Sequence, residues 1–137
     1  MNRAEFIKTL FFGAAGLGAT ISLKNTGIFR QQRTIRLLDC HIAGFQYYEG
    51  EAVLPRLNEG SELRLVREAD NPYDDKAVAI YYRNHKLGFI PRSDNEVIAN
   101  MIDQQISPSA KVTSINTEYG LYEAVGVEVY KNISNFN

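Results

Sequence analysis

A cluster of polar side chains surrounds one proline near the middle of the chain. Residues 70–75 read Asp-Asn-Pro-Tyr-Asp-Asp. The residue before a proline is pushed toward an extended conformation, and proline suits the first corner of a turn. Asp and Asn side chains can hydrogen-bond their own backbone there, but a turn needs only one or two of them. Surplus polar groups on a loop are typical of a binding site.

The same carboxylates raise the question of a metal-dependent enzyme, such as a phosphodiesterase built on Asp70, Asp74 and Asp75. Their spacing lacks the Asp-x-Asp-x-Asp-Gly alternation of a calcium-binding loop. His41 and His85, the two histidines, lie in no motif that pairs a base with a nucleophile. No phosphate-binding glycine loop and no G-x-S-x-G motif occurs. We therefore predict no metal site, no cofactor and no catalysis.

Cys40 is the single cysteine, which excludes an internal disulfide and a zinc site built from cysteines. It lies in an apolar run. Because free cysteine is commonly buried, we interpret Cys40 as a small core residue rather than a nucleophile.

Tyrosines and basic residues alternate around the predicted turns, and aromatic faces flanked by cations suit single-stranded nucleic acid. Tyr81 and Tyr82 follow one another on a predicted strand, so only one of them can face each side of the sheet. We interpret both as structural barrel residues, for which an inward apolar ring and a hydroxyl in water is the expected arrangement. Tyr47 and Tyr73 fall in predicted loops, where the structural and the binding interpretation are equally open. The set comprises Tyr47, Tyr48, Tyr73, Tyr81, Tyr82, Arg67, Lys86 and Arg92.

Short strands must position these residues. Alternating apolar and polar residues, punctuated by Gly and Pro, favour strands over helices in most of the chain. Residues 52–60 read as an irregular piece, and residues 83–86 as a tight connection. Together with one helix, the strands predict a mainly β fold, a small and strongly curved antiparallel barrel of six strands. The strands are expected at residues 35–42, 62–68, 77–82, 87–90, 111–115 and 122–130.

One helix is expected at about residues 93–105. Ser93 and Glu96 have the spacing of a capping box, in which each side chain meets the other's backbone N–H. Apolar residues then recur with helical spacing and predict one buried face. These residues are Val97, Ile98, Met101 and Ile102.

The N-terminal segment differs from the rest. Arg3 and Lys8 precede residues 9–23, which carry no charge. That block is short for a spanning helix, which needs about 20 apolar residues. The layout is typical of an export signal or anchor, so we predict that residues 1–23 form a hydrophobic helix of this kind and 24–32 a linker. An amphipathic helix packed on the domain or on another subunit is the alternative.

Charge is divided unevenly along the chain. Residues 1–32 carry four basic and one acidic group, whereas the remainder has a net charge of −4. The predicted domain therefore offers no bulk attraction to nucleic acid, and any such binding must be local.

Three segments resemble the signature blocks of the HIRAN domain. Residues 45–50 read Phe-Gln-Tyr-Tyr-Glu-Gly, residues 67–78 Arg-Glu-Ala-Asp-Asn-Pro-Tyr-Asp-Asp-Lys-Ala-Val, and residues 87–92 Leu-Gly-Phe-Ile-Pro-Arg. The resemblance predicts a HIRAN domain at 33–132, followed by a tail at 133–137. It implies a modified, OB-like β-barrel. HIRAN domains occur fused to helicase-like ATPases and nucleases in DNA repair, and also alone in bacteria.

In the fork-remodelling members the family implies a pocket for a single-stranded DNA end with a free 3′ hydroxyl. Carried onto this chain, Tyr47 and Tyr73 would stack on the terminal bases. Asn71 and Asp74 would read the last sugar and its hydroxyl, and Arg92 would meet a backbone phosphate.

Two positions depart from the DNA-binding members. Gln46 stands where they place an arginine, and Phe89 where they can place a histidine. Losing a phosphate contact lowers affinity and its salt dependence together. Weak binding of single-stranded DNA 3′ ends is therefore the predicted function. Hydrolase activity on acid anhydrides, with which HIRAN-bearing proteins are often labelled, belongs to fused ATPase modules that this chain lacks.

The N-terminal segment supports a second hypothesis. An exported or membrane-tethered interaction domain would use the same cleft for a non-DNA ligand or an unidentified protein partner. Residues 6–23 would then contact a membrane. From the charge layout we favour a bacterial protein that is exported or anchored in the inner membrane over a cytoplasmic one.

Overall fold

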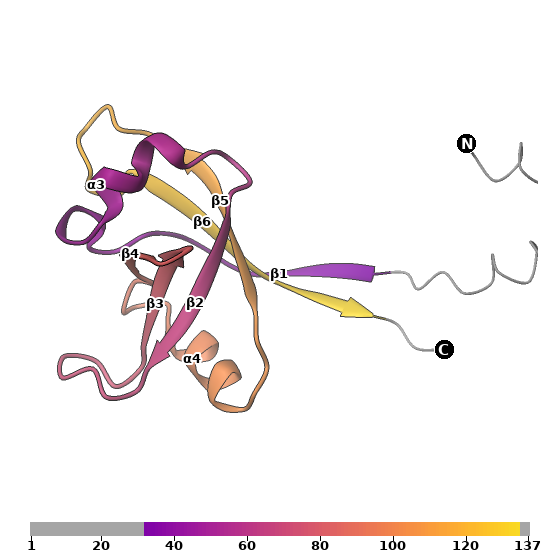
Figure 1. The fold of residues 1–137 in the computed structure, drawn as a ribbon. Helices are drawn as coiled ribbons and strands as arrows, with labels where there is room; N and C mark the ends of the chain where they lie inside the picture. The colour runs from indigo at the N-terminus through magenta and orange to yellow at the C-terminus, as the bar shows by residue number, and fades with distance from the viewer. Residues whose placement is uncertain (1–31, 135–137) are drawn as a thin grey trace, which may run out of the picture. The chain divides into compact units, whose positions relative to one another are not determined.

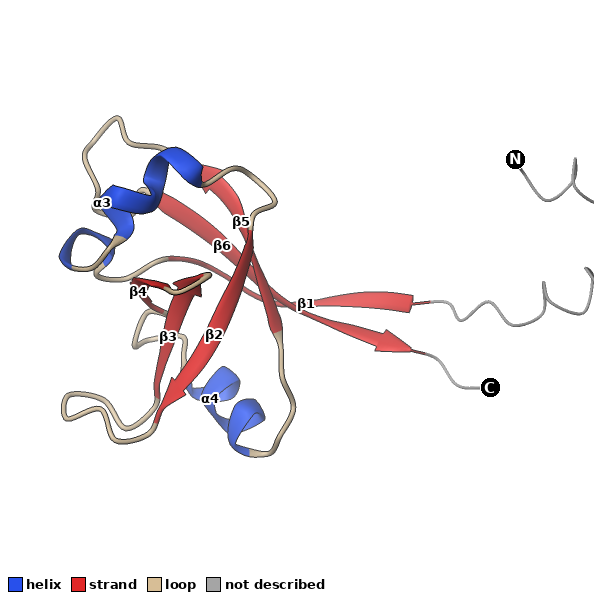
Figure 2. Ribbon diagram, in the orientation of Figure 1, coloured by secondary structure: helices blue, strands red, loops and turns tan. Residues whose placement is uncertain are grey.

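Six antiparallel strands form one sheet with the strand order β1-β6-β5-β2-β3-β4 (Figures 1 and 2). This confirms the predicted mainly β class and the strand number. The bounds are β1 (Gln32–His41), β2 (Glu62–Glu68), β3 (Ala77–Tyr82), β4 (His85–Phe89), β5 (Ser109–Ile115) and β6 (Val125–Ser134).

The structure is a computed structural model that describes residues 32–134, and Arg33–Ile133 forms one compact unit. The predicted hydrophobic helix and most of the predicted linker and tail lie outside the described residues. Within residues 32–134, no helix is long and apolar enough to cross a membrane.

The two outermost strands of the sheet, β1 and β4, are connected through the segment that follows β1. Ala43 forms an antiparallel bridge with Phe89 of β4, in which each N–H donates to the other's carbonyl at 2.8 and 3.0 Å. Gly88 permits this approach, because a Cβ there would lie 2.3 Å from the Ala43 carbonyl oxygen, and its φ is 147°. The bridge gives the sheet a barrel-like form.

Two consecutive hairpins, β2–β3 and β3–β4, contain the central polar turn and the connection that follows it. β2 pairs with β3 from Arg64↔Tyr81 to Glu68↔Ala77, so residues 69–76 form the connection. β3 pairs with β4 up to Tyr82↔His85, with a register shift between Ile80 and Tyr81. The second connection is therefore only Arg83 and Asn84, two residues shorter than predicted, and Arg83 has a φ of 54°.

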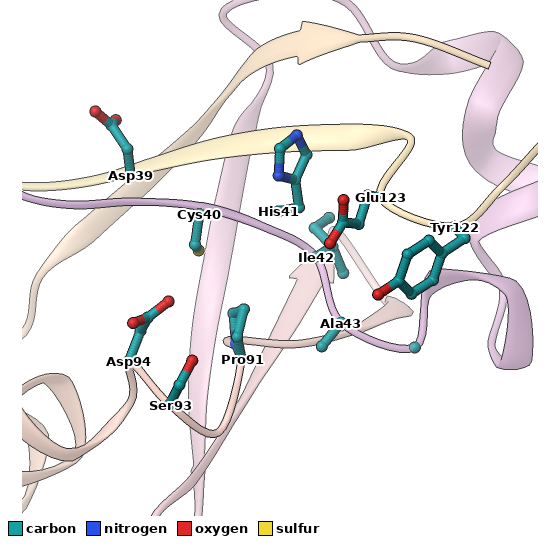
Figure 3. A pocket seen from close by; sticks show the side chains of 11 residues that line it. Asp39, Cys40, His41, Ile42, Ala43, Pro91, Ser93, Asp94, Tyr122 and Glu123 are labelled. Carbon is teal, nitrogen blue, oxygen red and sulfur yellow. The ribbon is translucent and has the colours of Figure 1, made fainter. Parts of the chain in front are cut away.

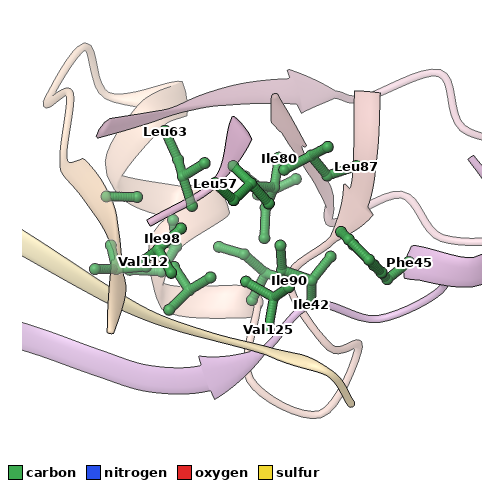
Figure 4. Close-up of a cluster of buried hydrophobic side chains, with 14 of the residues drawn as sticks. Ile42, Phe45, Leu57, Leu63, Ile80, Leu87, Ile90, Ile98, Val112 and Val125 are labelled. Atoms are coloured by element: carbon green, nitrogen blue, oxygen red, sulfur yellow. The ribbon is translucent and has the colours of Figure 1, made fainter. Parts of the chain in front are cut away.

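The core fills the barrel with buried side chains that include residues of β2, β3, β4, β5 and β6 (Figure 4). Three residues of β1 are partly buried and pack against it: Leu37, Leu38 and Cys40. Val125, Val127 and Val129 of β6 are all buried, as their alternation predicts. Phe45 is fully buried, and its ring lies where a Cβ on Gly50 would be, 2.5 Å from Cε2. Gly50 is thus required by the packing of Phe45.

The helices differ most from expectation. α4 spans Glu96–Asp103, shorter than the predicted 93–105. The capping box is wrong: Asn95 is the N-cap residue, and no side chain caps the helix. Val97 is 66% exposed, so it does not belong to the buried face.

A second short helix was missed. α3 (Gly50–Val53) is followed by the 3₁₀ turn η2 (Leu54–Arg56) inside the piece read as irregular. A further 3₁₀ turn, η1 (Phe45–Tyr47), precedes them.

Candidate functional site

The polar turn between β2 and β3 is held first by its own side chains. The Asn71 Oδ1 atom accepts from the backbone N–H groups of Tyr73 and Asp74, at 2.9 and 3.2 Å. The Asp74 Oδ1 atom accepts from the Lys76 N–H at 2.9 Å. These bonds are the turn-capping contacts that the residue types predict.

Helix α4 holds the turn from the other side. Asn95 Nδ2 donates to Asp74 Oδ2 at 2.7 Å, and Asn95 is 2% exposed. Lys76 Nζ donates to Asn100 Oδ1 at 3.0 Å. The Asp74 carboxylate is therefore fixed at both oxygens before any ligand arrives.

Arg67 adds a third anchor. Its guanidinium donates to Asp103 Oδ1 at 3.0 Å and to the carbonyls of Asp75 and Ala77 at 2.6 and 3.0 Å. The side chain is only 11% exposed. Arg67 was one of the cations predicted to suit single-stranded nucleic acid, but in the structure it connects the turn to β3 and α4.

A cavity of about 290 Å³, which we name the loop cavity, opens beside this turn. Its size is at the lower end of the ligand-pocket range of about 300–1,000 Å³. Its walls come from the turn, from β4 and from the segments after β1 and β4. The lining residues are Ala43, Tyr48, Asn71, Tyr73, Asp74, Ala77, Phe89, Ile90 and Arg92.

Asp74 carries the negative charge of the loop cavity. The hydrogen bond from the Lys76 N–H lowers the pKa of its carboxyl below the ordinary value, against a smaller opposing effect of desolvation. The Asn95 amide and the charges of Arg92 and Arg67 lower the pKa further. Asp74 is thus an ionised acceptor at neutral pH, with lone pairs beyond those that the protein uses.

Aromatic rings form much of the remaining wall. Tyr73 is 84% exposed. Tyr48 packs edge-on against Phe89, with ring centroids 5.6 Å apart and planes at 70°. The cavity is therefore lined by one solvent-exposed ring, that of Tyr73, and by a pair of rings that pack on each other, those of Tyr48 and Phe89.

Most of the predicted site residues line the loop cavity: Asn71, Tyr73, Asp74, Phe89 and Arg92. Gln46 and Tyr47 lie on η1 and do not line it, and Tyr47 is 78% exposed. Tyr48 lines the cavity, although the sequence placed it only in the wider set of tyrosines that suit nucleic acid and not among the predicted site residues. Its place beside Tyr47 in the 45–50 block was the available signal.

A second cavity, which we name the acidic cavity, has a volume of about 420 Å³ (Figure 3). Within the described part of the chain, three carboxylates line it and no lysine or arginine does. Burial, followed by the charges of Asp94 and Asp39, raises the pKa of Cys40 to about 12, so this thiol is protonated at neutral pH and is not an activated nucleophile. The lining residues are Asp39, Cys40, His41, Ile42, Ala43, Gly44, Pro91, Ser93, Asp94, Tyr122 and Glu123.

No group of three or more His, Cys, Asp or Glu side chains among residues 32–134 could hold a metal ion. The model of the HIRAN domain family matches residues 35–133. The chain belongs to the HIRAN domain family. The match contains all three segments on which the resemblance rested, and HIRAN domains are binding modules without catalysis of their own.

Two solved structures are similar to this HIRAN domain. A protein from Lactobacillus plantarum has a TM-score of 0.65 at 26% identity, covering 74% of this chain and 98% of that one. The HIRAN domain of human HLTF has a TM-score of 0.53 at 19% identity, covering 72% and 77% of the two chains. This second likeness shows the fold alone. No curated protein matches the chain.

Proposed function

We propose that this HIRAN domain binds single-stranded DNA ends in the loop cavity and recognises a terminal nucleoside with a free 3′ hydroxyl. The observation that carries the proposal is that an ionised Asp74 and Arg92 line one cavity together with an exposed tyrosine. Family membership supports nucleic acid as the ligand class. The barrel-like sheet would serve as a modified OB-type scaffold, a fold that commonly binds oligonucleotides.

The hydrogen-bonding capacity of the turn supports a hydroxyl as the recognised group. Asp74 can only accept, so it binds a hydroxyl hydrogen and repels a phosphate. Both lone pairs of Asn71 Oδ1 are used by backbone N–H groups, and Nδ2 donates to Glu68 Oε1 at 3.2 Å. Asn71 therefore offers a ligand one N–H, which suits a sugar or phosphate-ester oxygen.

The aromatic residues supply stacking surface for bases. Tyr73 would stack on the terminal base, and Phe89 with Tyr48 would form the opposing wall. Tyr47, exposed on η1 and outside the cavity lining, would stack on the next base. Stacking tolerates any base, so little sequence preference is expected.

Weak affinity follows from the small number of cations. Among residues 32–134, Arg92 is the only lysine or arginine that lines the loop cavity. Gln46 brings no charge, and residues 33–137 have a net charge of −4. Few phosphates can be neutralised, so binding should show a shallow salt dependence.

Fluorescence anisotropy with short oligonucleotides tests the proposal. The full-length chain should bind a 3′ hydroxyl end more tightly than a 3′ phosphate end. Tyr73→Ala should weaken binding by about 1–3 kcal/mol, the usual contribution of one stacked base. Tyr119→Ala is the matched control, because Tyr119 is equally exposed, at 85%, and lies outside the cavity. Equal binding of both ends, or equal effects of both variants, would contradict end recognition.

One observation favours the second candidate function. The net negative charge and the three carboxylates of the acidic cavity are unfavourable for a polyanion. An interaction domain that uses the loop cavity for a non-DNA ligand or protein partner would not have to overcome this repulsion. Absence of oligonucleotide binding at low ionic strength would support this alternative.

A further inference from the structure

Lys86 of β4 lies behind the aromatic wall of the loop cavity. Its Nζ is 4.4 Å from the ring centroid of Phe89 and 5.0 Å from that of Tyr48. Both rings line the cavity, whereas Lys86 does not. Its backbone carbonyl also accepts from the Glu49 N–H at 3.0 Å, next to Tyr48 in the chain. Lys86 therefore reaches the cavity only through other residues.

Glu68 connects this lysine to the polar turn. Its Oε2 lies 2.7 Å from Lys86 Nζ, and the two side chains are only 24% and 25% exposed. Its Oε1 accepts from Asn71 Nδ2. The Glu68 carboxylate thus connects Lys86, which contacts the Tyr48 and Phe89 rings, to the side-chain amide of Asn71.

The Asn71 amide is consequently held at both ends. Its oxygen takes two backbone N–H groups, and its nitrogen is fixed by Glu68. Removing Lys86 would leave the Glu68 carboxylate half-buried without its cation, which is unfavourable and would free it to turn toward water. The Asn71 nitrogen would then lose its partner.

We propose that Lys86 and Glu68 are positioning residues that set the preference of the loop cavity for a free 3′ hydroxyl without touching the DNA. The ion pair fixes the Asn71 amide, whose oxygen accepts from the Asp74 N–H and so helps to position the carboxylate that distinguishes a hydroxyl from a phosphate. The ammonium fixes the Tyr48–Phe89 wall by cation–π contacts. The inference rests on the proposed function of the same cavity.

Lys86→Met and Glu68→Gln test this in the full-length chain. The Gln amide has one acceptor oxygen where the carboxylate has two, so it cannot serve Lys86 and Asn71 equally. Each variant should lower the ratio of 3′ hydroxyl to 3′ phosphate affinity by roughly twofold to thirtyfold. The double variant should lose little more than either single one, because the residues act as a unit. Lys86→Arg, which can keep the ion pair with Glu68, should retain most of the natural ratio of 3′ hydroxyl to 3′ phosphate affinity.

Lys111→Met is the matched control. Lys111 Nζ also pairs with a glutamate, Glu128 at 3.9 Å, and lies 5.2 Å from the ring of Tyr130, away from the loop cavity. Lys111→Met should leave the ratio of 3′ hydroxyl to 3′ phosphate affinity unchanged. If Lys86 instead contacted a phosphate, Lys86→Met would reduce the salt slope by about 0.7 with the ratio unchanged, which would overturn the proposal. A loss of stability with unchanged affinities would also overturn it.

A readout without DNA separates this inference from the proposed function. The side-chain amide resonances of Asn71 should move in Lys86→Met and Glu68→Gln and stay in place in Lys111→Met. If the chain binds neither oligonucleotide, the proposed function fails, yet the Asn71 resonances still report the positioning. Unmoved Asn71 resonances would overturn the positioning role even where DNA binds.

Discussion

The loop cavity and the acidic cavity share the wall residue Ala43 but differ in chemistry. The acidic cavity is the larger, about 420 against 290 Å³, yet among the described residues its charged lining is three carboxylates without a lysine or arginine. The loop cavity combines one carboxylate with Arg92 and exposed aromatic surface. A phosphate backbone should therefore be repelled by the larger cavity and accepted by the smaller. Charge and hydrogen-bonding capacity, rather than volume, are the grounds on which we propose the loop cavity as the binding site.

A substitution that disturbs Ala43, the residue that lines both cavities, should have the largest effect on stability. Gly88→Ala places a Cβ against the Ala43 carbonyl at a φ of 147°, so both cavities should be distorted. We expect the free energy of unfolding to fall by about 3 kcal/mol in denaturant titrations. Gly60→Ala is the control, because Gly60 has a φ of 90° with nothing within 4 Å of its Cβ. It should cost only about 1 kcal/mol of backbone strain. Equal losses would show that the bridge does not close the barrel.

Asp74→Asn should remove the preference of the loop cavity for a hydroxyl. A hydrogen bond to a charged group contributes about 1.5–3 kcal/mol, so affinity for a 3′ hydroxyl end should fall by about 2 kcal/mol in anisotropy titrations. Binding of a 3′ phosphate end should improve, because the repelling charge is gone. Asp75→Asn, an exposed neighbour outside the cavity lining, should change neither.

Protonation of Asp74 at low pH should reduce the affinity for a 3′ hydroxyl end in the same way as Asp74→Asn. The pKa of Asp74 lies below its ordinary value of 3.8 because the folded turn donates hydrogen bonds to the carboxylate. The stabilisation is therefore complete above that value and is lost as the pH falls through the lowered pKa. Binding of a 3′ hydroxyl end should not change with Asp74 ionisation while the pH stays well above 3.8, and should weaken as the pH falls through the lowered pKa. An anisotropy titration that shows the same acid loss in Asp74→Asn would assign it to another group.

Arg92→Gln tests the single cation of the loop cavity. Loss of one phosphate contact should cost about 1 kcal/mol and reduce the salt slope by about 0.7. Anisotropy at several salt concentrations measures both. Arg33→Gln, on the exposed start of β1, should leave the slope as it is.

Asp94→Asn should give the smallest effect, with the opposite sign. Neutralising one carboxylate of the acidic cavity should tighten DNA binding by about 0.4 kcal/mol, the interaction of two charges roughly 10 Å apart in water. Anisotropy at low salt would detect it. Weaker binding would mean that the acidic cavity takes part in recognition.

The sequence predicted those features that depend on local chemistry. The bounds of β2 follow from alternation, and those of β3 from a short apolar run that begins after the polar turn. The capping by Asn71 follows from its place before a proline. The glycines of the family segments also have local consequences in the structure, since Gly50 admits Phe45 and Gly88 admits Ala43.

Contacts between distant segments were not predictable from the sequence. The bond from Asn95 to Asp74 joins residues 21 positions apart, and it uses the Asn95 side chain that could otherwise have capped α4. The place of Lys86 behind Phe89 depends on a register shift between β3 and β4 that no periodicity encodes. α3 is only four residues long, too short for a helical pattern to emerge.

Chemical-shift mapping of the full-length chain with a short 3′ hydroxyl oligonucleotide tests the central claim most directly. The loop cavity should respond, with the largest shifts at Asn71, Tyr73 and Asp74, while Asp39 and Glu123 of the acidic cavity stay in place. Shifts centred on the acidic cavity, or no shifts at low salt, would contradict the assignment of the loop cavity as the DNA-binding site.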